Sequence, residues 1–542
     1  MEFTRTKLLK LLDELNVIGI ALSAEKDHQR LLEMILIRAK DITNADGGTL
    51  YIRTEDNRLR FEIMQTNTLK IHMGGTSGEE IPFYPVYLYR EDGSPNLNNV
   101  AACAVLERKT INTPDAYEDT EFDFSGTRNF DKKTGYRSKS FLTVPMVNHE
   151  NNIIGVLQLI NAIDTETGEV IPFSDVSQQL VESLASQAAV TITNRSLLDA
   201  QKELFDALIK LIANAIDEKS PYTAGHCRRV PVLTNLIANA ACKVNYGPLA
   251  EFNMSDEEKY ELDVAAWLHD CGKITTPEYV VDKGTKLETI FDRIELVDTR
   301  FEVLKRDVVI ESLRKKLESL GHASHEDDEL QQKLDKLDQD RDFIRLCNIG
   351  GESISDKDIK RVEEISKMQW QNTAGNQEYF LTDEEKQNLN IGRGTLSYRE
   401  REIINNHVSV TIKMLESLPY PKHLQRVPEY AGGHHEKMDG TGYPNQLKKE
   451  DMSIPARMLA IADVFEALTA KDRPYKEAMT LSKALTILGR MKLDNHVDPD
   501  LFDVFMWEKL YLKYAEEHLE PEQIDDVDPE NIPGYTPPPA VN

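Results

Sequence analysis

Residues 174–219 form the feature that most constrains the fold of this chain. The run keeps a helical pattern throughout and contains neither glycine nor proline. A helix of this length cannot bury itself within one small domain. We therefore expect it to join two domains and to pair with its copy in a homodimer. The alternative is a bent helix that packs on its own domain.

The size and composition of the chain indicate a multidomain cytoplasmic protein. At about 150 residues per domain, 542 residues predict three or four units. The five cysteines are scattered and form no C-x-x-C pair, which suits a reducing compartment and argues against a disulfide framework. No apolar run approaches the length of a membrane span, and the first residues are typical of an amphipathic helix rather than a signal peptide. We therefore expect no membrane partner.

The charge of the chain limits its partners further. The net charge of -28 repels nucleic acid polymers, so we expect none as a partner. An anionic substrate of smaller size remains compatible with this charge only if a local cluster of positive charge overcomes the global field.

The pattern along the chain predicts several regions. Residues 1–175 mix helices with strands rich in β-branched and aromatic residues, such as GTLYIRT and SFLTVPMV. The connecting helix covers 176–219, and 220–519 are mostly helical. A highly charged block at about 287–390 reads as an inserted helical arm, either a dimerisation or regulatory arm or a solvated decoration. The acidic, proline-rich tail, 520–542, is predicted to be disordered.

Potential metal ligands gather in the C-terminal half. Asp463 lies within IPARMLAIADVFEALTA, a helix that is apolar almost all round. An unpaired buried carboxylate is costly, so this side chain needs a metal, a helix cap or an arginine as partner. The candidate set comprises five imidazoles and two carboxylates: His226, His269, His407, His434, His435, Asp270 and Asp463.

Counting the ligands favours two metal ions. A single ion rarely takes seven protein ligands of this kind, whereas two ions do if Asp270 bridges them. Two divalent ions, two carboxylates, a bridging hydroxide and one phosphodiester sum to zero charge. This is the layout of a two-metal phosphoester hydrolase, with the ions about 3.5–4 Å apart. Imidazole with carboxylate suits iron, manganese, zinc or nickel and excludes a calcium or magnesium cage.

Two motifs at these residues resemble the signatures of the HD-GYP family, a branch of the HD metal-dependent phosphohydrolases. They are HDCGK (269–273) and HHEKMDGTGYP (434–444), and the segments PYTAGHCRRV (221–230) and IADVFEALTAKDRPYK (461–476) agree with the family in order and approximate spacing. Several motifs in register are more specific than a lone HD pair. The resemblance implies an all-α domain that hydrolyses cyclic di-GMP to linear pGpG, to GMP, or to both.

The resemblance also implies roles for individual residues. The same seven side chains are the family's metal ligands, with iron or manganese as the expected ions, and Asp270 and Lys273 are the catalytic residues. Members with a third metal carry a glutamate four residues before His226, where this chain has Tyr222, so we expect two ions. The expected substrate contacts are Lys273, Arg473, Lys476 and the loop residues Gly442, Tyr443 and Pro444.

The N-terminal half resembles a GAF domain over residues 130–162, which implies an antiparallel sheet flanked by helices. GAF domains that bind cyclic nucleotides carry an Asn-Lys…Phe…Asp-Glu motif. Here Asn161 is followed by Ala162, and Phe173 and Asp175 occur without the glutamate. Two roles stay open: a sensor of some small-molecule ligand, or a structural dimerisation domain.

The leading hypothesis is a phosphodiesterase for cyclic di-GMP that attacks the phosphodiester with a metal-bridging hydroxide and is regulated by the GAF domain. The alternatives are hydrolysis of cyclic GMP-AMP, a catalytically silent receptor for a cyclic dinucleotide, or an HD phosphohydrolase with another nucleotide substrate. The GYP segment argues against the last, since simpler HD enzymes lack it.

Overall fold

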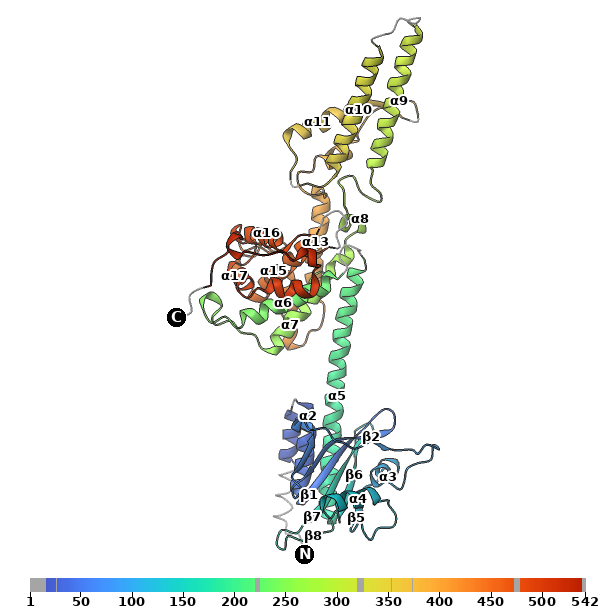
Figure 1. The fold of residues 1–542 in the computed structure, drawn as a ribbon, viewed down its shortest axis with the longest axis vertical. Helices are drawn as coiled ribbons and strands as arrows, with labels where there is room; N and C mark the ends of the chain where they lie inside the picture. The colour runs from blue at the N-terminus through green and yellow to red at the C-terminus, as the bar shows by residue number, and fades with distance from the viewer. Residues whose placement is uncertain are drawn as a thin grey trace. The chain divides into compact units, whose positions relative to one another are not determined.

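The computed structural model describes residues 16–538, apart from 26, 220–224, 319–325, 352, 373 and 472–477. The chain divides into two compact units, Met1–Phe205 and Asp206–Asn542. Figure 1 shows the elements of both units with their labels. None of the helices in the described part of the chain is long and apolar enough to cross a membrane.

The first unit is built on one antiparallel sheet with the order β3-β2-β1-β7-β6-β5. Its longest strand is rich in isoleucine, leucine and valine, residues that suit a buried pleated surface. Two short strands, β4 (Val86–Tyr87) and β8 (Val170–Ile171), pair with β2 and β7. The main strands are β1 (Ala45–Arg53), β2 (Arg58–Thr66), β3 (Ile71–Gly74), β5 (Ile111–Thr113), β6 (Phe141–Val147) and β7 (Ile153–Ile163).

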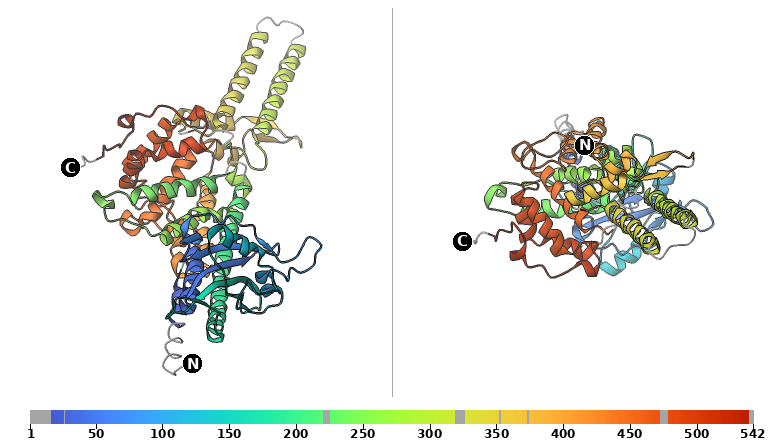
Figure 2. Two further views of the ribbon diagram at one scale, coloured as in Figure 1. Left: turned by 60° about the horizontal axis from the view of Figure 1, so that its bottom comes forward. Right: turned by 90° about the horizontal axis from the view of Figure 1, so that it is seen from above.

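Helices cover both faces of this sheet, as the sequence predicts (Figures 1 and 2). On one face, α2 (His28–Thr43) packs with α5 (Asp175–Asp217) in a core that includes Leu36 and Leu157. On the other face, α3 (Val100–Leu106) contacts β6 and β7, and α4 (Ser125–Thr134) follows.

Helix α5 is not only a connector. The sequence predicts a domain boundary at residue 175, whereas Val181, Leu184, Ala188 and Ile192 of α5 are buried in the core of the first unit. Small alanines on this face of the helix allow close packing against the sheet, so the first turns of α5 are part of the domain.

The second unit has a helical body that carries the candidate site. Helix α15 packs on α6, α6 packs on α7, and α13 packs on α14. Helix α15 is buried along most of its length, in agreement with its nearly continuous apolar sequence. The helices of this body are α6 (His226–Ala241), α7 (Asp256–Leu268), α8 (Glu278–Val281), α13 (Tyr398–Glu416), α14 (Val427–Gly432), α15 (Ile454–Thr469), α16 (Leu481–Leu493), α17 (Pro499–Trp507) and α18 (Leu510–His518).

The inserted block contains the predicted helical arm and also a small core of its own. The arm consists of α9 (Ile294–Glu318) and α10 (Glu326–Asn348), which lie side by side in Figures 1 and 2. Phe301, Ile344 and Phe380 are fully buried at its base, which makes the block more than a solvated decoration. Its other elements are α11 (Asp356–Ser366), β9 (Gln369–Gln371), β10 (Gln377–Tyr379) and α12 (Asp383–Leu389).

The tail differs from its predicted disorder. The Gln523 amide donates to the backbone carbonyl of Thr469 at 2.8 Å, and the Trp507 indole donates to the carbonyl of Thr536 at 2.6 Å. Ile532 is buried against the body. The composition of this segment predicts too little apolar burial for an ordered structure. The helical body nevertheless supplies an apolar surface, a hydrogen-bond donor and an acceptor, so residues 521–538 pack on it.

Candidate metal centre

The structure brings the predicted metal ligands together from elements far apart in the sequence. His226, His269 and Asp270 form one group with ligand atoms within 4.8 Å of one another, and His407, His434 and His435 form a second. We call these the first and the second group. They come from the start of α6, the end of α7, the middle of α13 and the end of α14.

Asp270 faces both groups with different oxygens. Its Oδ2 lies 3.3 Å from His226 Nε2 and 3.2 Å from His269 Nε2. Its Oδ1 lies 3.2 Å from His407 Nε2 and 3.9 Å from His434 Nε2. A carboxylate arranged in this way is able to bridge two cations, one in each group.

Asp463 belongs with the first group. Its Oδ1 lies 3.3 Å from His226 Nε2 and 3.8 Å from His269 Nε2. The side chain projects from α15, which is buried along most of its length. The buried carboxylate therefore has cationic or metal-binding partners rather than a helix cap, as its position requires.

Three imidazoles are held in one tautomer by backbone carbonyls. His269 Nδ1 donates to Ala266 at 2.7 Å, and His434 Nδ1 donates to Ala431 at 2.6 Å. His407 Nδ1 donates to Ile404 at 2.5 Å. Because a carbonyl only accepts, each Nδ1 carries the proton and each Nε2 keeps its lone pair for a metal.

Three buried side-chain atoms of the two groups lack a hydrogen-bond partner. Asp270 Oδ1, His407 Nε2 and His434 Nε2 are buried and have no hydrogen-bond partner. Native proteins rarely leave buried acceptors unpaired, and a cation satisfies all three at once. The donor set of imidazole and carboxylate fits divalent transition metals. The residues present therefore fit a two-metal centre.

The electrostatics of the two groups differ. Burial lowers the pKa of His435 to about 4 and holds that of His434 well below its usual value. Burial also disfavours the charged form of Asp270, but the Lys273 ammonium together with His269 and His226 outweighs it and holds the pKa of Asp270 well below the usual range. In the first group burial is outweighed by the neighbouring carboxylates, which raise the pKa of His269 to about 9 and that of His226 well above its usual value. Metal binding requires the neutral imidazole and the ionised carboxylate, so an ion in the first group would displace protons from these histidines.

Sequence reasoning did not single out Glu466, which lies behind the proposed metal ligand His226. It is buried on α15, one turn after Asp463, and its Oε2 accepts from His226 Nδ1. Its Oε1 accepts from Arg229 Nε at 2.6 Å. A carboxylate behind an imidazole fixes the ring and raises its basicity as a ligand. Its spacing of three residues from Asp463 places both carboxylates on one face of α15, but it does not reveal the contact with His226.

The turn that carries the HD pair is set against α13 by a glycine. The 3-10 helix η3 (Cys271–Thr275) follows Asp270, and Gly272 N–H donates to Thr411 Oγ1 at 2.9 Å. A Cβ on Gly272 would lie 2.0 Å from the backbone oxygen of His407. This close approach brings Asp270 to His407.

Within the GYP loop, Tyr443 stacks on His435, with ring centroids 4.8 Å apart. The Tyr443–Pro444 bond is cis, and a Cβ on Gly442 would lie 2.4 Å from the backbone nitrogen of Lys437. The loop therefore folds tightly onto the histidine pair, with Tyr443 against the imidazole.

Two acidic residues of this stretch hold the loop and not the imidazoles. The sequence predicts that Glu436 and Asp439 orient imidazoles, and the structure shows a different role. Glu436 accepts from the backbone nitrogens of Asn445 and Leu447 at 2.7 and 3.0 Å. Asp439 accepts from Thr441 within its own turn.

The predicted phosphate contacts are only in part described. Lys273 Nζ lies 2.6 Å from Asp270 Oδ2, at the edge of the site. Arg473, Lys476 and Tyr222 lie outside the described residues.

Asn161, which matches one position of the incomplete cyclic-nucleotide motif, has a structural role. Asn161 is buried, with Oδ1 accepting from Lys139 N at 2.7 Å and Nδ2 donating to the Tyr136 hydroxyl at 2.9 Å.

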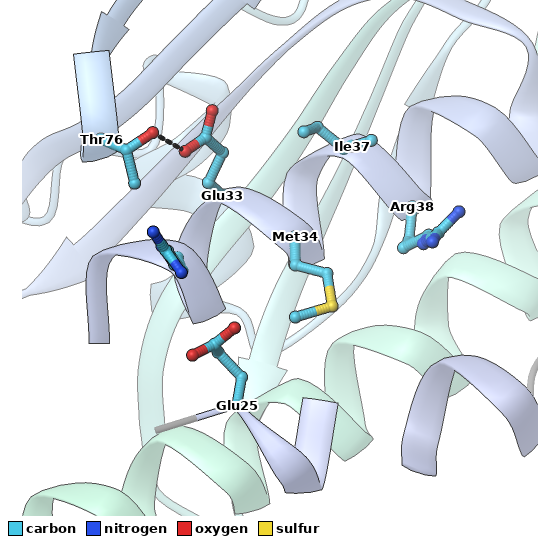
Figure 3. A pocket seen from close by; sticks show the side chains of 7 residues that line it. Glu25, Glu33, Met34, Ile37, Arg38 and Thr76 are labelled. Atoms are coloured by element: carbon cyan, nitrogen blue, oxygen red, sulfur yellow. Dashed lines mark hydrogen bonds between the residues drawn. The ribbon is translucent and has the colours of Figure 1, made fainter. Parts of the chain in front are cut away.

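A separate pocket of 440 Å³ lies beside α2 in the first unit. Figure 3 shows Glu33 facing Thr76 there, where the Thr76 hydroxyl donates to its carboxylate.

Comparisons with known proteins match both units. Residues 27–192 match the GAF domain family, and residues 384–501 match the HD domain family. The "3'3'-cGAMP-specific phosphodiesterase 3" of Vibrio cholerae is 25% identical over 65% of this chain and 53% of its own length. The "3'3'-cGAMP-specific phosphodiesterase 1" of the same organism is 42% identical over 15% of this chain and 18% of its own. A "Cyclic di-GMP phosphodiesterase" from it is 35% identical over 23% of each chain.

Two segments of the chain therefore match the GAF and HD domain families, and the predicted resemblance to HD-GYP proteins is confirmed at this level. The matched region spans about half the length of the first relative and less of the others. The HD match begins at residue 384, so it excludes the first group of ligands, which the inserted block separates from the second.

Proposed function

We propose that this protein is a metal-dependent phosphodiesterase that hydrolyses cyclic di-GMP, with cyclic GMP-AMP as the alternative substrate. The observation that carries the proposal is the position of Asp270, whose two oxygens face two separate groups of imidazoles. The names of the relatives support both substrates.

The first group with Asp463 would hold one ion, the second group would hold the other, and Asp270 would be shared. Two bound transition metals, iron or manganese by the family resemblance, would supply water of lowered pKa and neutralise phosphate charge. Residues of the chain would orient the imidazole ligands. Glu466 holds the His226 ring, and Tyr443 supports His435 from one side.

Lys273 is the chain's cation beside the proposed site of attack. Its ammonium lies against Asp270 in a mostly buried position, where a positive charge stabilises a developing phosphorane more strongly than it would in water. It also offsets the acidic net charge of the chain locally, so that an anionic dinucleotide is attracted to this position.

Substrate and activity are tested with the whole chain. The protein is reconstituted anaerobically with Fe²⁺ or Mn²⁺, and its products from cyclic di-GMP and cyclic GMP-AMP are separated by chromatography. We expect two metal equivalents, a linear dinucleotide or mononucleotide product, and no product after chelation. Protein that holds two ions yet cleaves neither dinucleotide overturns the proposal, and if it binds one without cleaving it, it is a receptor.

We also propose that α5 pairs two copies of the chain and that the GAF domain acts on the phosphodiesterase through this helix. Leu197, Leu204 and Leu211 recur every seven residues on α5 and are 57%, 62% and 62% exposed. A heptad of exposed leucines fits a second copy of the same helix. Sedimentation velocity is expected to show a dimer, and Leu204→Lys with Leu211→Lys is expected to give a monomer. A monomeric unmodified chain would contradict this.

A further inference from the structure

We propose that Asp217, the last residue of α5, and Lys219, two residues beyond it, are positioning residues that set the spacing between the two sides of the metal centre. The inference rests on the proposed function. It concerns residues that touch neither a metal nor a substrate, and it names the point at which α5 acts on the site.

Asp217 holds the backbone on either side of His226. The residue is the last of α5 and is buried. Its Oδ2 accepts from Gly225 N at 3.0 Å, and its Oδ1 accepts from Cys227 N at 3.4 Å. Helix α6 begins at His226, and its own N-cap, Gly225, has no side chain to offer. Asp217 therefore acts as the cap of α6 from another helix.

Lys219 holds the other side of the centre. Its Nζ donates to three backbone carbonyls, those of Lys273 at 3.1 Å, Ile274 at 2.6 Å and Thr276 at 2.6 Å. An ammonium has three protons, and these contacts use all of them. The carbonyls lie at the end of η3 and just beyond it, where a cation is stabilising. The Lys273 carbonyl also accepts from Thr276 N at 3.0 Å.

The two contacts meet at the site from opposite directions. Asp217 acts on His226, while Lys219 acts on the turn that carries Asp270 and Lys273. His226 Nε2 and Asp270 Oδ2 are 3.3 Å apart, so the distance across the first group depends on these two backbone segments. A metal centre tolerates displacements of only about 0.5 Å. Asp217 and Lys219, only two positions apart in sequence, therefore hold the backbone segments on both sides of the first group.

Because Lys219 is half-buried, its positioning role can be distinguished from a general contribution to the stability of the fold. Its side chain is half-buried, so water is able to replace the ammonium at the three carbonyls if the donors are lost. The fold then loses little, whereas η3 loses the contact that holds its register. The first turns of α5 contribute Leu184 and Ala188 to the core of the first unit, so its C-terminal end is the place where a shift of the helix would reach the ligands.

The test compares Lys219→Met, which keeps the aliphatic stem and removes the donors, with Lys219→Arg, which keeps donors. Metal affinity is measured by chelator competition, turnover on the cleaved dinucleotide, and Tm by calorimetry. For Lys219→Met we expect about 10- to 100-fold weaker metal binding, a similar fall in kcat and an unchanged KM. Its Tm is expected to fall by no more than about 4 °C. Lys219→Arg is expected to recover most of the affinity.

Lys492→Met is the matched control. Lys492 also donates to a backbone carbonyl, that of Gly534 at 2.7 Å, but it does so between α16 and the tail. This variant is expected to keep metal affinity while losing stability. Unchanged metal affinity in Lys219→Met overturns the proposal. Wild-type protein that binds two ions but cleaves no dinucleotide would overturn the proposed function alone, because the affinity comparison still applies.

Discussion

Asp270→Asn is expected to abolish binding of the metal pair and to lower turnover at least about 1000-fold. The carboxylate faces four imidazoles, two through each oxygen. An amide offers one neutral oxygen in place of two anionic ones, so one group loses its shared ligand and both lose a negative charge. The variant also leaves the Lys273 ammonium beside an amide in a mostly buried position.

Metal content by mass spectrometry and turnover of the dinucleotide are the two readouts. The GAF unit is expected to keep its secondary structure, because none of its described residues takes part in the site. Glu450→Gln, which removes an exposed carboxylate from the second unit, where Asp270 also lies, serves as the matched control and is expected to retain both ions and full activity. If Asp270→Asn still held two equivalents of metal, the bridging role would be wrong.

Gly272→Ala is expected to lower the free energy of unfolding by about 3 kcal/mol and to weaken metal binding at the same time. The added Cβ would lie 2.0 Å from the His407 oxygen and 2.6 Å from the Thr411 nitrogen. Both are backbone atoms of α13 and cannot rotate away as the end of a side chain can. The turn and the helix must therefore move apart, which separates Asp270 from His407.

Urea denaturation and chelator competition measure the two effects. Gly392→Ala is the matched control, because a Cβ there meets nothing within 4 Å and the residue lies in the same unit. It is expected to be neutral in both measurements. A Gly272→Ala variant with native stability and native metal affinity would show that η3 and α13 have room that the structure does not give them.

Local sequence patterns predict much of the secondary structure of this protein. The length of α5, the antiparallel strands of the first unit and the apolar character of α15 follow from periodicity, which depends on neighbours in sequence. The seven proposed ligands were also chosen from sequence, because imidazole and carboxylate in these motifs have few other uses.

Three features were not predictable in this way. The role of Glu466 depends on His226, which approaches it from another helix. The packed tail depends on anchors such as Gln523 that meet carbonyls of the body. The core of the inserted block depends on contacts among Phe301, Ile344 and Phe380. In each case the partner lies far away in sequence, and local propensity carries no information about it.

The sequence by itself determined which donors the chain possesses and which segments form helices and strands. Only the tertiary structure decided which donors meet: that Asp270 directs its two oxygens to different groups, that Gly272 lets α13 approach, and that Asp217 and Lys219 hold the two sides. The physical reason is that a metal centre depends on distances between elements. Those distances are set by packing across the whole domain, whereas donor identity is set residue by residue.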